Sequence, residues 1–316
     1  MDNLTHSLTA LALSRAGLCR YAARPALILI VAANMPDIDI LSALAGPVRY
    51  LDFHRGLAHS LALMPVMALF PALLALLLAR SRAGWRAAYA LSLIGVASHL
   101  LLDWTNSYGI RLLLPFSGEW LHGDLNSVVD VWIWAVLFLA FLGPLLGRLV
   151  SSEIGAKPGS GKGLAIFALA FISIHDYGRY LAHRRTLAML DSRIYDGAAP
   201  RRIAAFPSVF SPLKWTGWVE TETSFLRFDM TLLGGFDPGA SSRVYKPAAS
   251  PAIDAAHTTE AFRVFENFAL YPLWTVSPAD DPEGAVRVEL RDQRFPFTAT
   301  AIVDRSNKVV KAWFHL

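Results

Sequence analysis

Residues 60–79 read SLALMPVMALFPALLALLLA, a stretch of twenty residues without a charged side chain. An α-helix needs about 20 apolar residues to cross the roughly 30 Å hydrocarbon core of a bilayer. Pro65 and Pro71 would kink such a helix, which membrane helices tolerate. This stretch therefore predicts a transmembrane helix.

Other apolar stretches in the first half of the chain are expected to pack beside this helix. Residues 87–104 and 128–149 are strong candidates, 25–45 and 163–181 are interrupted by polar residues, and 4–18 is short. Only 17% of all residues are charged, against about 25% in typical soluble domains. The sequence therefore predicts an α-helical transmembrane bundle of four to six membrane segments.

Arginine and lysine are concentrated in alternate connections between these segments. With six segments, the basic connections 15–24, 80–86 and 148–162 all lie on one side, which the positive-inside rule makes cytoplasmic. The connections 46–58 and 105–127 and the C-terminal region then lie on the non-cytoplasmic face. No cleaved signal peptide is expected, because no basic residue precedes the first apolar stretch.

The composition changes after residue 183, which predicts a second region. We expect a membrane-embedded helical domain over 1–183, a linker over 184–205 and a small β-rich soluble domain over 206–316. Three short stretches alternate in polarity: WVETETSFLRFDM, AVRVELRDQRF and FTATAIVDRSNKVVKAWF. The last two indicate strands, with DRSNK as a turn.

The charge and cysteine content exclude some classes of function. The net charge of +4 is scattered, and no basic patch is interleaved with aromatic residues, so direct nucleic-acid binding is not expected. The chain has one cysteine, Cys19, so it cannot form an internal disulfide.

Ionisable residues interrupt the apolar segments, mostly towards one end of the expected bundle. Such side chains are costly in a membrane, so they indicate function and usually face the bundle interior. The candidates are His6, Asp37, Asp39, His54, Arg55, His59, His99 and Asp103. Asp130, His175 and Asp176 are weaker candidates, because a polar group at a helix end commonly meets water.

The spacing of these residues indicates which of them can meet. His99 and Asp103 are four residues apart and share one helical face. Asp37 and Asp39 would diverge on a regular helix and converge only where the chain is extended or broken, as Pro36 makes plausible. Taken singly, these residues could also be helix caps, interfacial loop residues or buried hydrogen-bonded pairs.

Mixed imidazole and carboxylate ligands suit a divalent metal, here zinc or manganese, as one or two ions. The expected ligands are His6, Asp37, Asp39, His54, His59, His99 and Asp103. A metal-activated water would attack an ester or phosphoester. Arg55, which would hold an anionic oxygen, and Asp37 are the expected catalytic residues.

These motifs resemble the YdjM-type (DUF457) family of inner-membrane proteins. The resemblance is carried by MDNLTHSLTALAL, ANMPDIDIL, HRGLAHSL and SHLLLDWTNSYGIRLLLPFS, within residues 1–125, and by FPSVFSPLKWTGWVETE at 206–222. The family is described as membrane-bound metal-dependent hydrolases and is also labelled LexA-binding. The resemblance implies a multi-pass protein of the bacterial inner membrane, with metal ligands at the seven positions named above.

Two classes of function remain open from the sequence. The first is a hydrolase acting on a lipid-linked or other amphiphilic substrate, because the site lies at one end of an apolar bundle. The second is a non-enzymatic membrane protein, in which the metal serves an interaction, regulatory or ion-binding role. Apart from the lipid bilayer, the sequence identifies no partner.

Overall fold

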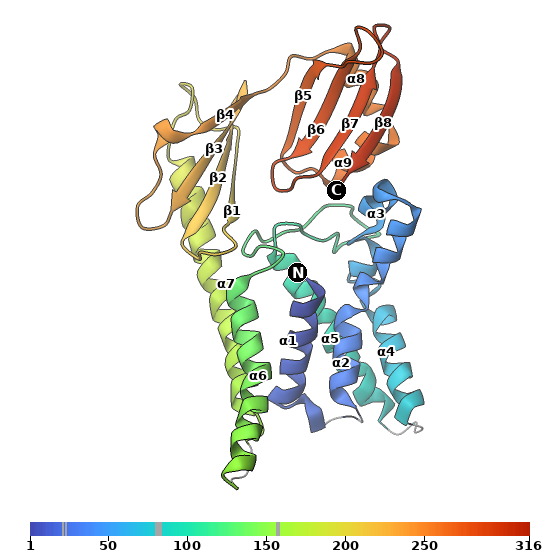
Figure 1. The fold of residues 1–316 in the computed structure, drawn as a ribbon, viewed down its shortest axis with the longest axis vertical. Coiled ribbons are helices and arrows are strands. Elements are labelled where there is room, and N and C mark those ends of the chain that lie inside the picture. The colour runs from blue at the N-terminus through green and yellow to red at the C-terminus, as the bar shows by residue number, and fades with distance from the viewer. Residues whose placement is uncertain (21, 23, 80–83, 156–158) are drawn as a thin grey trace.

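The computed structural model describes residues 1–20, 22, 24–79, 84–155 and 159–316, so parts of the three basic connections lie outside the described residues. Long helices form an elongated bundle, and two β-sheets lie beyond one end of it (Figure 1). The helices of the bundle are α1 (Asn3–Ala16), α2 (Pro25–Asn34), α4 (Met64–Ala79), α5 (Trp85–Thr105), α6 (Val131–Glu153) and α7 (Lys162–Asp191).

Short helical segments connect these helices at the end nearest the sheets. They are η2 (Pro36–Ala45), α3 (Pro47–Phe53) and η3 (Leu57–His59); a further short helix, η1 (Leu18–Arg20), follows α1. The chain turns by 43° between α2 and η2, at the break expected from Pro36, and by 80° between the α3–η3 segment and α4. These breaks place polar residues at the end of the bundle instead of within continuous helices.

Two of the described helices, α5 and α6, are long and apolar enough to cross a membrane, and the number rises to four if each bent pair is one span. The expected count of four to six segments is therefore not confirmed. Helix α1 has only 14 residues, and α2 and α4, with 10 and 16, reach the roughly 20 residues that a span requires only together with the bent segments beside them. Helix α7 is long, but polar and charged residues interrupt its apolar stretch.

Helices α2 and α5 pack unusually closely, which matters for the site. A Cβ atom on Gly95 would lie 2.7 Å from Ala32 Cβ and 3.0 Å from the Leu29 carbonyl oxygen. Small residues allow helix backbones to approach each other in this way. The close approach brings the end of α2 against the part of α5 that carries His99.

The C-terminal region contains two antiparallel four-stranded sheets. The first follows the order β1 (Arg202–Pro207), β2 (Lys214–Glu220), β3 (Ser224–Thr231) and β4 (Ser242–Tyr245). The second follows β5 (Pro272–Pro278), β6 (Val286–Asp292), β7 (Thr298–Val303) and β8 (Val309–His315). The remaining elements are η4 (Pro238–Ala240), α8 (Pro251–His257) and α9 (Glu260–Phe268).

The expected linker at 184–205 is largely structured. Helix α7 continues to Asp191 and strand β1 begins at Arg202. Leu190 is fully buried and packs with Trp215 and Phe228 of the first sheet, so the end of α7 belongs to the core of that sheet. The β-rich region is thus joined to the bundle by a continuous helix (Figure 1).

The second sheet docks on the connections that surround the polar end of the bundle. Phe262, Phe265 and Phe268 of α9 share an apolar cluster with Tyr108 and Trp120, which lie in the connection between α5 and α6. Aromatic side chains contribute much of the buried area in such contacts. This cluster fixes the connection that follows Asp103.

Candidate metal centre

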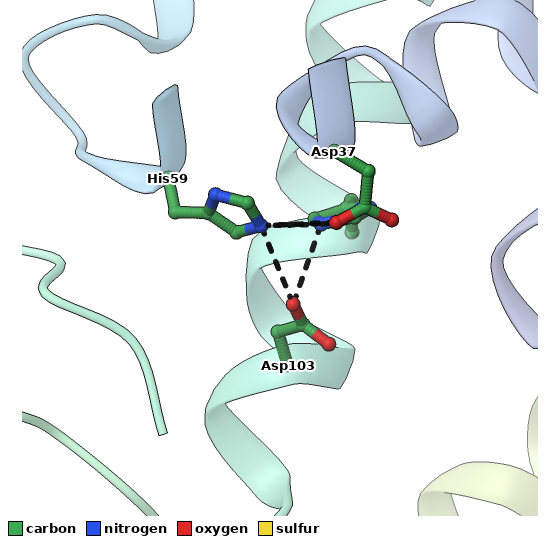
Figure 2. A group of neighbouring side chains, drawn as sticks. Asp37, His59 and Asp103 are labelled. Atoms are coloured by element: carbon green, nitrogen blue, oxygen red, sulfur yellow. Dashed lines mark hydrogen bonds and ion pairs between the residues drawn. The ribbon is translucent and has the colours of Figure 1, made fainter. Parts of the chain in front are cut away.

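Four side chains from three segments converge at the end of the bundle nearest the sheets. They are Asp37 of η2, His59 of η3, and His99 and Asp103 of α5. One donor atom from each lies within 4.8 Å of all the others. Figure 2 shows Asp37, His59 and Asp103 pointing toward one another from these separate segments.

Five of the six separations between donor atoms are close to those around a tetrahedral metal ion. The two imidazole Nε2 atoms are 3.0 Å apart, and Asp103 Oδ2 lies 3.5 Å from His59 Nε2 and 3.4 Å from His99 Nε2. Asp37 Oδ1 lies 3.4 Å from His59 Nε2 and 3.7 Å from His99 Nε2. Metal–ligand bonds of about 2.1 Å in tetrahedral geometry place ligand atoms about 3.4 Å apart.

One of the four donor atoms is also left without a hydrogen-bond partner in a way that suits an ion. Asp103 Oδ1 pairs with Arg55 Nη2 at 3.1 Å and with the amino group of Met1, whereas the buried Oδ2 has no hydrogen-bond partner. His99 Nδ1 donates to the Ala33 carbonyl oxygen at 2.7 Å, so in a neutral ring the lone pair is on Nε2, which faces His59 Nε2. Such a contact typically orients metal-binding histidines.

Asp39 lies beside the four donors and contacts one of them, His59, and two neighbouring residues, His54 and Arg55. Its Oδ1 is 2.8 Å from His54 Nδ1, and its Oδ2 accepts a hydrogen bond of 2.9 Å from the Arg55 backbone amide. The same Oδ2 lies 3.1 Å from His59 Nδ1, on the far side of that ring from the other donors. Asp37, Asp39 and His54 also form a second group with donor atoms within 4.8 Å.

The helical form of η2 explains how Asp37 and Asp39 approach the same region. In a 3₁₀-helix residues two apart differ in direction by about 120°, against about 160° in an α-helix. Both aspartates can therefore face His59 from the same segment.

Arg55 is buried, with 3% of its surface exposed, and both terminal nitrogens of its guanidinium contact oxygen atoms of the protein. Besides Asp103, it contacts Asn106 Oδ1 at 3.1 Å and the Gly109 carbonyl oxygen at 3.2 Å, while Nε has no hydrogen-bond partner. The backbone of Arg55 has φ +54°, which is uncommon for a residue other than glycine and is often found at functional sites. Arg55 thus orients Asp103 and keeps one N–H available.

His6 of α1 is fully buried beside the four donor residues, but its ring nitrogens are not grouped with the four donor atoms. Its ring stacks on that of His99 with centroids 3.9 Å apart, and its Nε2 lies 3.4 Å from Asp103 Oδ1 and 3.2 Å from the Met1 carbonyl oxygen. It is outside both groups of clustered donor atoms. A role for His6 as a ligand stays a prediction.

Residues after Asp103 support the centre but were not predicted. Asn106 accepts hydrogen bonds from Arg55 and from the Tyr108 backbone amide, and it lies 3.4 Å from Asp103. The Arg55 guanidinium lies 4.5 Å from the Tyr108 ring centroid. Burial raises the pKa of the Tyr108 phenol, so this group stays neutral beside the centre. The sequence signal that could have identified Asn106 and Tyr108 was their position in the stretch DWTNSYG, which begins at Asp103.

The weaker candidates form a separate cluster at the start of α6. Asp130 Oδ2 pairs with Arg179 Nη2 at 3.1 Å and lies 3.6 Å from His175 Nε2, while Asp176 accepts a hydrogen bond from Asn126. Asp130 also caps α6, because its Oδ1 accepts from the backbone amides at the start of that helix. This cluster joins α6 to α7 and lies outside the two donor groups.

Comparisons with known proteins identify the family to which the part of the chain with this site is similar. A family model described as YdjM inner membrane protein matches residues 1–182, which include all the residues of the centre. "Uncharacterized protein YfhP" of Bacillus subtilis (strain 168) is 29% identical over 106 residues, covering 33% of this chain and 32% of that protein. The chain thus matches about a third of the length of this curated relative. No solved structure matches the chain.

Proposed function

Because the chain belongs to the YdjM inner membrane protein family, we propose that it is a membrane-bound, metal-dependent hydrolase of an ester or phosphoester. The single observation that carries the proposal is the set of four donors at tetrahedral spacing, with an unpartnered Asp103 Oδ2 among them. Zinc or manganese fits two imidazoles and two carboxylates.

The four donors differ in exposure, which suggests a division of roles. The side chains of His59, His99 and Asp103 are fully buried, whereas that of Asp37 is 11% exposed. Catalytic zinc sites typically use three protein ligands and keep one position open. We assign His59, His99 and Asp103 as the ligands that hold the ion, and Asp37 as the group on the open side.

When bound, a divalent ion would supply Lewis-acid chemistry and lower the pKa of a water molecule beside it. Asp37 is then placed to accept the proton of the attacking water. The unpartnered Nε of Arg55 is placed to donate a hydrogen bond to an anionic oxygen of the substrate. Asp39 holds the His59 ring and the Arg55 backbone in position.

An amphiphilic substrate fits the surroundings of the centre. An apolar groove of about 280 Å³ lies beside α5 and is lined by Leu61, Met64, Leu101 and Trp104. Leu61 is two residues from His59, and Trp104 follows Asp103 directly. A hydrocarbon chain would lie in this groove on the exposed face of α5, while His99 and Asp103 are buried on another face of the same helix.

A metal with a purely structural role is the second candidate. Four protein ligands complete a tetrahedral shell, and closed shells of this kind are typical of structural sites. The chain would then be an interaction or regulatory protein of the membrane. The two functions differ in whether an intact centre produces turnover.

Metal analysis and hydrolysis assays on the same purified protein test the proposal. We expect one equivalent of zinc or manganese, chelator-sensitive hydrolysis of lipid phosphates or esters, and loss of both metal and activity in His59→Ala. His315→Ala, at the exposed end of β8, is the matched control and should retain both. Bound metal without turnover on any such substrate would favour the structural role, and turnover retained in His59→Ala would reject the assigned site.

The proposed location is the bacterial inner (cytoplasmic) membrane, with the two sheets on the non-cytoplasmic face. Both sheets lie at the end of the bundle opposite the last turns of α6 and the first turn of α7, which carry Arg148 and Lys162 (Figure 1). A reporter enzyme fused after Leu316 should be active only outside the cytoplasm. Activity inside the cytoplasm would contradict this orientation.

A further inference from the structure

A cleft of about 550 Å³ lies where the two sheets meet the connection between α5 and α6. Its size is within the range of about 300–1,000 Å³ that is typical of small-molecule sites. Thr216, Trp218 and Arg227 of the first sheet line one wall, Gln293 follows β6, and Ser107 follows α5. Most of these residues lie beyond the part of the chain that the family model matches.

Buried polar atoms on the wall of this cleft have no hydrogen-bond partners. The Ser107 side chain is 8% exposed, and its Oγ is unpartnered. Both the Nε2 and the Oε1 atoms of Gln293 are also unpartnered. Buried polar groups in native proteins are nearly always paired. These atoms have no partner within the described protein and are covered in the absence of a ligand, so a rotation of the two side chains into the cleft would let them pair with a ligand that offers both donors and acceptors.

The charge of the cleft is positive. Among its described lining residues there are two arginines and no aspartate or glutamate. Arg294 is neutralised by Asp292 at 2.8 Å and also donates to the Ser107 and Phe268 carbonyl oxygens. Arg227 is exposed and forms no ion pair within the part of the chain that the structure describes; its guanidinium lies 5.9 Å from the Trp218 ring centroid. Arg227 is therefore the cation available to a ligand.

We infer that this cleft binds a phosphorylated polyol. The planar guanidinium of Arg227 suits a phosphate group. Hydroxyl groups donate and accept hydrogen bonds, as the Gln293 amide and the Ser107 hydroxyl require. The ligand is either a soluble polyol phosphate or the polyol head group of an anionic glycerophospholipid such as phosphatidylglycerol, which phosphatidylcholine lacks. The inference goes beyond the proposed hydrolase, because it does not depend on a metal at the centre.

The inference is tested by calorimetric titration of the full chain, in phosphatidylcholine nanodiscs, with glycerol 3-phosphate. We expect saturable binding that is about tenfold weaker or more in Arg227→Gln, because a charge-assisted hydrogen bond is lost. Arg287→Gln, an equal change of charge at an exposed position of β6 outside the cleft, should bind normally. Thr216→Trp, which fills the cleft, should abolish binding.

Two further measurements separate the cleft from the metal centre and identify the source of the ligand. His59→Ala should still bind glycerol 3-phosphate, even if it binds no metal. Phosphatidylglycerol added to the nanodisc should weaken the binding of glycerol 3-phosphate if the ligand is a lipid head group, and should leave it unchanged if the ligand is soluble. Absence of saturable binding, or equal binding by the parent chain, Arg227→Gln and Thr216→Trp, would overturn the inference.

Discussion

Replacing Asp39 by asparagine removes one negative charge beside the proposed centre while keeping the size of the side chain. In the structure Asp39 contacts His54 Nδ1 at 2.8 Å, the Arg55 amide at 2.9 Å and His59 Nδ1 at 3.1 Å. An amide can keep one acceptor, but its NH₂ group would face a donor or a ring nitrogen on the other side. The expected effect is a less basic and less firmly oriented His59.

The size of this effect follows from the position of Asp39. Loss of a partner that orients a metal ligand typically weakens metal affinity by about 10- to 100-fold. Because Asp39 contacts only His59 among the three assigned ligands, we expect an intermediate loss of about 30-fold, or about 2 kcal/mol. The number of bound ions should remain one.

Competition with a metal chelator, together with metal content by mass spectrometry, measures both quantities in the purified protein. Asp254→Asn, on the exposed side of α8, is the matched control and should bind metal normally. His99→Ala, which removes a ligand, should lose far more affinity than Asp39→Asn. An unchanged affinity in Asp39→Asn, or a fall from two ions to one, would refute the assignment of Asp39 as an orienting residue outside the ligand set.

Three further predictions concern stability. Arg179→Met should destabilise the protein by about 3 kcal/mol, because Asp130 stays buried without its cation; thermal unfolding measures this, with the exposed Arg185→Met as control. Gly95→Ala should lower the free energy of unfolding by about 1–3 kcal/mol and weaken metal binding, because its Cβ would push α2 away from α5. Gly147→Ala is the control: a Cβ at this position has open space around it, so the change should affect neither stability nor metal binding. Burial raises the pKa of Tyr271 from 10.0 to about 12, so its contribution to stability is lost as the pH rises through this range. Thermal unfolding measured as a function of pH checks this: Tyr271→Phe should lose less stability between pH 10 and pH 12 than the parent chain does.

Several features followed from the sequence alone, because they depend on local patterns. A long uncharged run such as 60–79 indicates an apolar helix wherever it lies in the chain, and the structure forms α4 over Met64–Ala79, which reaches the length of a membrane span only together with the bent α3–η3 segment. The strands around DRSNK were predictable because alternating side chains flank a turn, and the structure places β7 and β8 there. The metal donors were candidates because ionisable groups are costly among apolar residues.

Tertiary structure decided how these candidates are used. Asp37 and Asp39 are two residues apart in the same apolar stretch, and the sequence does not distinguish their roles. In the structure Asp37 is grouped with His99 and Asp103, whereas Asp39 contacts His59 Nδ1, on the opposite side of that ring. The difference depends on the 3₁₀ form of η2 and on the angle at which it leaves α2. Likewise, the cleft of Ser107 and Gln293 exists only because distant segments pack together. Distances between residues far apart in the chain are set by packing, which no local pattern specifies.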